Sequence, residues 1–129
     1  MSIQQPQQRA GQKILIVDDE DLFLQLIKDI LDEEGINATA TSSPANALNI
    51  INTTDVDILI TDIKMPEISG IELAIKAKSK QPDTAVIFIT GYSDLINGYS
   101  GDLDFEDYFL LKKPFPMDDM VKLLRELGA

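Results

Sequence analysis

Residues 14–20 read ILIVDDE, and the change within this stretch from apolar to acidic side chains sets the fold class. Its first four residues, Ile14 to Val17, are mostly β-branched and show no polar alternation, which is typical of a strand buried on both faces of a sheet. The acids that follow would stand at the carboxyl end of that strand. In an open α/β sheet, this end is where ligands bind.

Apolar runs of strand length alternate with segments of helical period along the rest of the chain. Further strands are predicted at residues 37–41, 57–61, 84–89 and 108–111, and helices at 21–34, 43–52, 69–80 and 116–127. Another helix within 94–107 is expected to be short or frayed, because Gly98 and Gly101 each destabilise a helix by about 1 kcal/mol relative to alanine. Five strands alternating with five helices predict an α/β fold: a doubly wound, flavodoxin-like parallel sheet of five strands in the order 2-1-3-4-5.

Composition limits the classes of function. The chain has 129 residues, enough for one domain at 13–129, and the polar, glutamine-rich residues 1–12 are expected to be a disordered lead-in. The absence of cysteine and histidine excludes disulfide frameworks, thiolate chemistry and histidine-based triads. A net charge of -11 disfavours nucleic acid and anionic membranes as partners and favours a hard cation or a basic protein surface. Since no apolar run reaches membrane-spanning length and no signal-peptide pattern is present, a cytoplasmic location is expected.

Polar side chains follow four of the predicted strands and would meet at one edge of the sheet. In chain order they are Asp18, Asp19, Asp62, Thr90 and Lys113, and Gly91 follows Thr90. Taken singly, each is more often a turn former or a solvated side chain, so the joint pattern carries the prediction. The further acids Glu20, Asp21, Asp118 and Asp119 are interpreted as solvated or helix N-terminal charges.

This set of side chains suits phosphoryl transfer. Clustered carboxylates repel one another unless a divalent cation or a lysine neutralises them, and oxygen ligands with open positions suit Mg²⁺. Asp62 would attack a phosphoryl group whose oxygens contact Mg²⁺, Lys113 and the Thr90 hydroxyl, and Gly91 would leave room for its approach.

Four segments together resemble the receiver domains of two-component response regulators, including the single-domain chemotaxis regulator. They are ILIVDDE at 14–20, ITDIKMP at 60–66 with Gly70, ITG at 89–91 and KPF at 113–115. The resemblance extends from Lys13 to the end of the sequence. It implies that Asp62 accepts a phosphoryl group from a sensor histidine kinase or a histidine phosphotransfer protein. The chain would then be a self-catalysed switch of partner binding rather than an enzyme.

The resemblance also implies roles for the other site residues. Mg²⁺ would be bound by Asp19, Asp62 and the backbone carbonyl of Lys64, with Asp18 acting through water. Lys113 would pair with the phosphoryl group and precede a cis bond to Pro114, and Thr90 would move to hydrogen-bond the phosphoryl group. The lifetime of the phosphoaspartate would be tuned by Lys64, Gly91 and Tyr92.

One position departs from the family pattern. Leu110 stands three residues before Lys113, where the family often has tyrosine or phenylalanine. Taking Lys112 as the site lysine would place Phe109 there, but Lys113 is preferred because it directly precedes proline. A simple aromatic flip is therefore not expected, and residues 94–107 become the expected element that phosphorylation orders or shifts.

Two other classes of function are considered. A phosphatase with an aspartyl nucleophile would need a second aspartate two residues after Asp62, where Lys64 stands. A degenerate receiver that only binds partners is disfavoured by the complete acidic set. The kinase, the stimulus, the output partner and the oligomeric state stay open. So does the question of whether the chain acts alone or belongs to a longer regulator or hybrid kinase.

Overall fold

The computed structural model describes residues 12–91 and 108–129. Its strands are β1 (Ile14–Val17), β2 (Thr39–Thr41), β3 (Ile58–Asp62), β4 (Ala85–Thr90) and β5 (Tyr108–Lys112). Its helices are α1 (Asp21–Glu33), α2 (Pro44–Thr53), α3 (Gly70–Lys80) and α5 (Met117–Glu126). The predicted lead-in, apart from Gln12, and the predicted helix within 94–107 fall outside the described residues.

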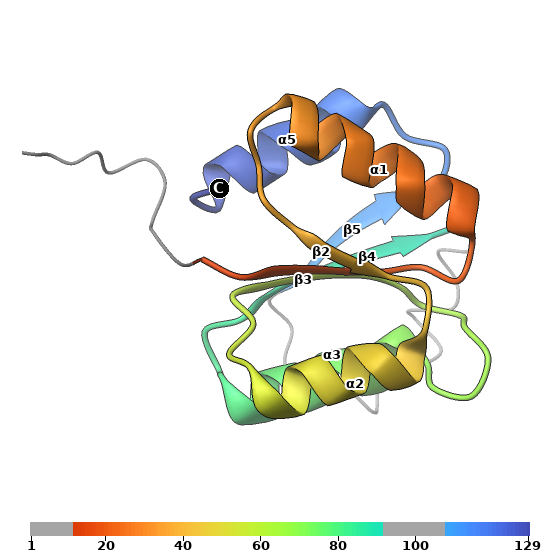
Figure 1. Cartoon of the computed structure of the whole chain (residues 1–129), viewed down its shortest axis with the longest axis vertical. Helices are drawn as coiled ribbons and strands as arrows, with labels where there is room; N and C mark the ends of the chain where they lie inside the picture. The colour runs from red at the N-terminus through yellow and green to blue at the C-terminus, as the bar shows by residue number, and fades with distance from the viewer. Residues whose placement is uncertain (1–11, 92–107) are drawn as a thin grey trace, which may run out of the picture.

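All five strands are parallel and lie in the order β2-β1-β3-β4-β5, as predicted. Helices α1 and α5 cover one face of the sheet, and α2 and α3 cover the other (Figure 1). None of the described helices combines the length and the hydrophobicity that a membrane crossing requires. The doubly wound, flavodoxin-like α/β fold is therefore confirmed.

The sheet separates two apolar layers, because successive side chains of each central strand point to opposite faces. The layer beneath α2 and α3 takes Leu15, Val17, Leu59, Val86 and Phe88 from the sheet. The layer beneath α1 and α5 takes Ile14, Ile16, Ile58, Ile60, Ile87 and Ile89. Strands buried on both faces are what the unbroken apolar runs predicted.

Strands β3 and β4 each begin and end one residue later than predicted, and β5 ends one residue later, at Lys112. Strands β3 and β4 end at Asp62 and Thr90, which the sequence had placed just after the strands. Each lies opposite a residue of the neighbouring strand, Asp62 opposite Ile89 and Thr90 opposite Lys112. The backbone of both polar residues is thus held by the sheet rather than by a loop. Strand β2 is also shorter than predicted and begins at Thr39.

The start of α3 is fixed against the end of β3. The Ser69 hydroxyl accepts the Glu72 N–H at 3.2 Å, and the Glu72 carboxylate accepts the Ser69 N–H at 3.1 Å, which forms a capping box. Gly70 then approaches the backbone carbonyl of Asp62 so closely that an added Cβ would collide with it and with the Thr61 hydroxyl. Only glycine allows this contact between helix and strand.

The two ends of the described chain lie close together at the amino ends of the strands, opposite the carboxyl ends where α1 begins. The Gln12 side-chain amide donates to the backbone carbonyl of Leu127 at 3.4 Å. In Figure 1 the C-terminus lies near the start of β1, and α1 begins at the far end of the sheet.

Candidate functional site

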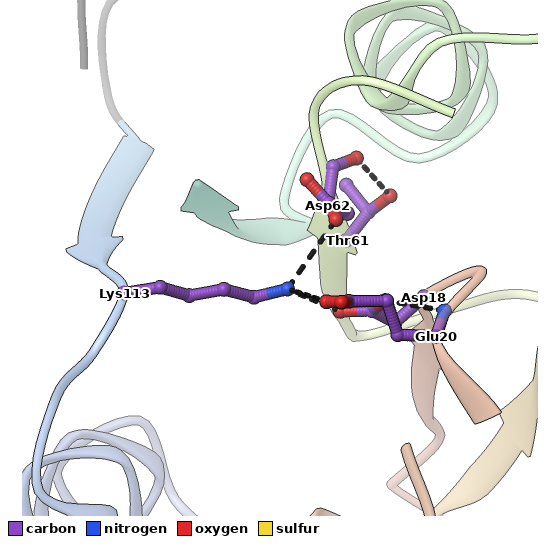
Figure 2. A network of polar contacts seen from close by, with 5 residues as sticks. All are labelled: Asp18, Glu20, Thr61, Asp62 and Lys113. Carbon is purple, nitrogen blue, oxygen red and sulfur yellow. Dashed lines mark hydrogen bonds and ion pairs between the residues drawn. The ribbon is translucent and has the colours of Figure 1, made fainter. Parts of the chain in front are cut away.

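Acidic side chains converge on one lysine at the carboxyl edge of the sheet (Figure 2). Lys113, which follows β5, places its Nζ 2.7 Å from Glu20 Oε1, 3.2 Å from Asp18 Oδ2 and 3.5 Å from Asp62 Oδ2. Asp18 and Glu20 follow β1, and Asp62 ends β3. Because parallel strands end at one edge, three segments far apart in sequence supply one charged cluster.

Asp18 is the innermost member of the cluster. Its side chain is fully buried, and its Oδ1 accepts the backbone N–H of Glu20 at 2.8 Å. Burial raises the pKa of Asp18, while the Glu20 N–H and the Lys113 charge oppose that rise. Asp18 therefore closes the turn from β1 into α1 and depends on Lys113 for its charge balance.

Asp62 is more accessible than Asp18, with 14% of its side chain exposed. Burial raises its pKa, Lys113 opposes the rise, and the negative charge of Asp19 adds to it. The Thr61 hydroxyl donates to the backbone carbonyl of Asp62 at 2.8 Å, which fixes the end of β3. Asp62 is thus a basic carboxylate on a rigid backbone, beside a cation.

Lys113 is held by charges that outweigh its burial. Burial lowers its pKa, but the hydrogen bond to Glu20 and the charges of Asp18 and Asp62 act against this, so the pKa of Lys113 is raised overall. Its Nζ also lies 4.3 Å from the centre of the Phe23 ring, a cation–π contact. The lysine therefore stays charged across the whole neutral range.

Thr90 and Gly91 stand beside the cluster at the end of β4. Thr90 is buried, and its backbone carbonyl accepts the Lys113 N–H at 2.7 Å. Gly91 is exposed, and among the described residues a Cβ there would meet no atom within 4 Å. The peptide bond between Lys113 and Pro114 is cis, as the resemblance implied.

The structure brings three of the predicted site residues into direct contact. Asp18, Asp62 and Lys113 meet, and Lys113 rather than Lys112 reaches the carboxylates. Asp19 and Lys64 are exposed. Tyr92 lies outside the described residues.

Glu20 was missed as a member of the site. As predicted from the sequence, Glu20 is exposed and stands at the start of α1. The sequence did not predict that its carboxylate contacts Lys113. Its carboxylate makes the shortest contact of Lys113, across 93 residues of sequence. The sequence does place Glu20 third in a row of acids after β1. An acid at that position is also common at the start of a helix, so the position alone does not indicate a contact with Lys113.

The donor set of the cluster suits a hard cation. Oxygen atoms of Asp18, Glu20 and Asp62 all lie within 4.8 Å of one another. Only carboxylate oxygens are offered, and Mg²⁺ prefers such ligands and keeps several waters. The residues present therefore fit the ion that the sequence predicts.

This fold, with an acidic cluster and a lysine at the carboxyl edge of its sheet, defines the receiver class of signalling domains. Residues 14–125 match the response regulator receiver domain family. The chain belongs to that family, and it is a receiver domain of two-component signalling.

Individual relatives agree with this assignment. The response regulator receiver protein CpdR of Brucella abortus is 30% identical over 115 residues, which cover 89% of this chain and 95% of the relative. The response regulator SaeR of Staphylococcus epidermidis is 36% identical over 90% of this chain, but the match spans only 50% of SaeR. The crystal structure of a response regulator receiver domain protein from Clostridium thermocellum superposes with a TM-score of 0.76 at 34% identity, covering 90% of this chain and 93% of that one.

Proposed function

We propose that this receiver domain is a phosphoacceptor switch in which Asp62 takes a phosphoryl group from a phosphohistidine of a sensor kinase or a phosphotransfer protein. One observation carries the proposal: the Asp62 carboxylate is partly accessible at the carboxyl edge, with the Lys113 ammonium 3.5 Å away. The raised pKa of Asp62 supports it further, because a more basic carboxylate is a stronger nucleophile.

In the proposed reaction, an Asp62 oxygen forms a bond to phosphorus while the P–N bond to the donor imidazole breaks, and the imidazole leaves with the electron pair. Lys113 is placed to neutralise the phosphoryl oxygens, as transfer through a loose transition state requires. The Thr90 hydroxyl would hydrogen-bond one of these oxygens, and the open space at Gly91 would admit the group. Lys64, Gly91 and Tyr92 would set how readily water reaches the phosphoaspartate.

Mg²⁺ is the proposed cofactor. It would be held by Asp62, Asp19 and the backbone carbonyl of Lys64, with Asp18 assisting through water. When bound, Mg²⁺ supplies positive charge that stabilises the phosphoryl oxygens during transfer. The convergence of Asp18 and Asp62, and the effect of the Asp19 charge on Asp62, support this assignment.

The proposed output is a change in partner affinity. Phosphorylation would order or shift residues 94–107, a segment outside the described residues, so this switch stays a prediction. Leu110, at the position of the usual aromatic residue, has neither a ring nor a hydroxyl and is 38% exposed. Because the chain spans about half the length of the SaeR relatives, a further output domain belongs to the proposal and not to the established family assignment.

The test uses acetyl phosphate and Mg²⁺ with intact-mass readout. Wild type is expected to gain one phosphoryl group and Asp62→Asn none, because the amide cannot act as the nucleophile. Asp83→Asn is the matched control, since Asp83 is an exposed acid away from the cluster and its loss should leave labelling unchanged. Equal labelling of Asp62→Asn and wild type would refute the proposal. A wild type that no donor labels would favour a receiver that only binds partners.

A further inference from the structure

The shortest contact of the site lysine is not with the proposed phosphoacceptor. Lys113 Nζ lies 2.7 Å from Glu20 and 3.5 Å from Asp62. The Glu20 side chain is 64% exposed, so its contact with the lysine is not forced by burial. This pair is a specific arrangement that calls for a physical explanation.

Glu20 occupies the N-cap position of α1 but does not cap the helix. No side-chain hydrogen bond from Glu20 to the first turn is formed, although N-cap oxygens commonly accept a helix N–H. Its backbone N–H is tied to Asp18 Oδ1 at 2.8 Å, which fixes the position of its Cα. The free carboxylate is directed to Lys113 instead.

The turn from β1 into α1 therefore holds the lysine on several sides. Asp18 and Glu20 accept its N–H groups, and the Phe23 ring lies 4.3 Å from its Nζ. Phe23 in turn meets Phe115, two residues after the lysine, with ring centres 6.1 Å apart. Together these contacts draw the ammonium toward β1 and away from Asp62.

We propose that Glu20 is a positioning residue that holds Lys113 in a resting position and occupies its ammonium until a phosphoryl group takes its place. This inference rests on the proposed function. In the resting state the Glu20 oxygen neutralises the lysine. In the phosphorylated state a phosphoryl oxygen on Asp62 competes for the same ammonium and draws it away from Glu20. Glu20 thus opposes phosphorylation and favours the unmodified state.

Three variants separate this contact from a general effect of charge. Glu20→Gln removes the charge and keeps the length. Glu20→Asp keeps the charge but is one methylene shorter, and aspartate at an N-cap prefers to accept a helix N–H, which withdraws it from Lys113. Asp21→Asn is the matched control, because Asp21 is the adjacent exposed acid in the first turn of α1.

The first readout is the ¹⁵N signal of the Lys113 ammonium in the unphosphorylated protein. Both Glu20 variants are expected to shift or broaden this signal, because the ammonium loses its shortest partner and exchanges faster with water. Asp21→Asn should leave it in place. An unchanged signal in Glu20→Gln would overturn the inference, whatever the rate of phosphorylation.

The second readout is the rate of labelling by acetyl phosphate, with Mg²⁺ affinity measured alongside. Both Glu20 variants should be labelled roughly 2- to 5-fold faster than Asp21→Asn, the range that one exposed ion pair accounts for. Slower labelling with weaker Mg²⁺ binding in Glu20→Gln would make Glu20 a metal ligand and overturn the inference. So would a Glu20→Asp variant that matches wild type. If wild type is labelled and the Glu20 variants are labelled at the same rate, this inference alone is refuted. If wild type is not labelled, the proposed function is refuted as well.

Discussion

The pKa of Asp18 and that of Asp62 are raised, because the burial of each carboxyl group outweighs the opposing effect of the Lys113 charge. A carboxyl group whose pKa is raised on folding stabilises the folded state most below its ordinary pKa of 3.8. That contribution is lost as the pH rises through the raised value. The charged forms of Asp18 and Asp62 therefore lower the stability of the folded state near neutral pH.

Replacing one of these acids should recover stability in a pH-dependent way. Asp62→Asn removes a raised carboxyl group, so it is expected to be more stable than wild type by about 0.5–2 kcal/mol at about pH 7, with the difference shrinking toward about pH 4. Urea denaturation across this range measures the effect. Asp83→Asn, at the exposed surface, should change stability by less than about 0.5 kcal/mol. A difference that grows toward acidic pH would show that folding does not raise the pKa of Asp62.

The sequence pattern predicted which side chains lie together, and their roles in the site stay predictions. Asp18, Asp62 and Lys113 each stand at the end of a predicted strand, and the fold brings all three together. Glu20 was not predicted to join them, because a helix start already accounts for an acid at that position. Its partner, Lys113, lies 93 residues away in the sequence. Nothing in the local sequence indicates that the two residues are close in space.

At the scale of the elements, the close contact between Gly70 of α3 and the Asp62 carbonyl of β3 sets how this helix packs on the strand. Gly70→Ala should destabilise the fold by about 1–3 kcal/mol, because the new methyl group would collide with the Asp62 carbonyl. Thermal or urea unfolding measures the loss. Gly91→Ala is the matched control, since its Cβ would meet no atom of the described residues within 4 Å, and its stability should stay within about 0.5 kcal/mol of wild type. Equal stability of the two variants would show that α3 can shift freely.

Element types followed from the sequence, whereas element ends did not. Buried strands and amphipathic helices have distinct periods, so each described element was identified. The ends of β3 and β4 extend one residue further because Asp62 and Thr90 pair with neighbouring strands. That pairing depends on register across the sheet, which a single segment cannot reveal.

For the molecule as a whole, both apolar layers share the same sheet and should unfold together. Ile27→Val lies in the layer of α1 and α5, and Ile51→Val in that of α2 and α3. Each is expected to lower stability by about 0.5–1.5 kcal/mol without changing the dependence on urea. Circular dichroism and tyrosine fluorescence should give coincident transitions. Leu22→Ala, at an 89% exposed position of α1, is the surface control. Separate transitions in either buried variant would show that the faces unfold independently.

The strand order was predictable because parallel strands joined by helices allow few topologies. Side-chain contacts across the sheet were not, because the Lys113–Asp18 pair joins residues 95 apart in sequence. Such pairs depend on the register between strands and on the residue at which each strand ends. Both are determined only when the whole sheet assembles.

The contact between Gln12 and Leu127 shows that the two ends of the described chain lie close together. Both ends of the described chain leave from the edge opposite the acidic cluster, so a host protein can carry the domain as an insert without covering the site. The same geometry makes the chain suitable for circular permutation: a short linker would join the ends, and new termini would open in a surface loop. A permuted chain that keeps its labelling by acetyl phosphate would show that the order of the strands in space, rather than their order along the chain, makes the switch.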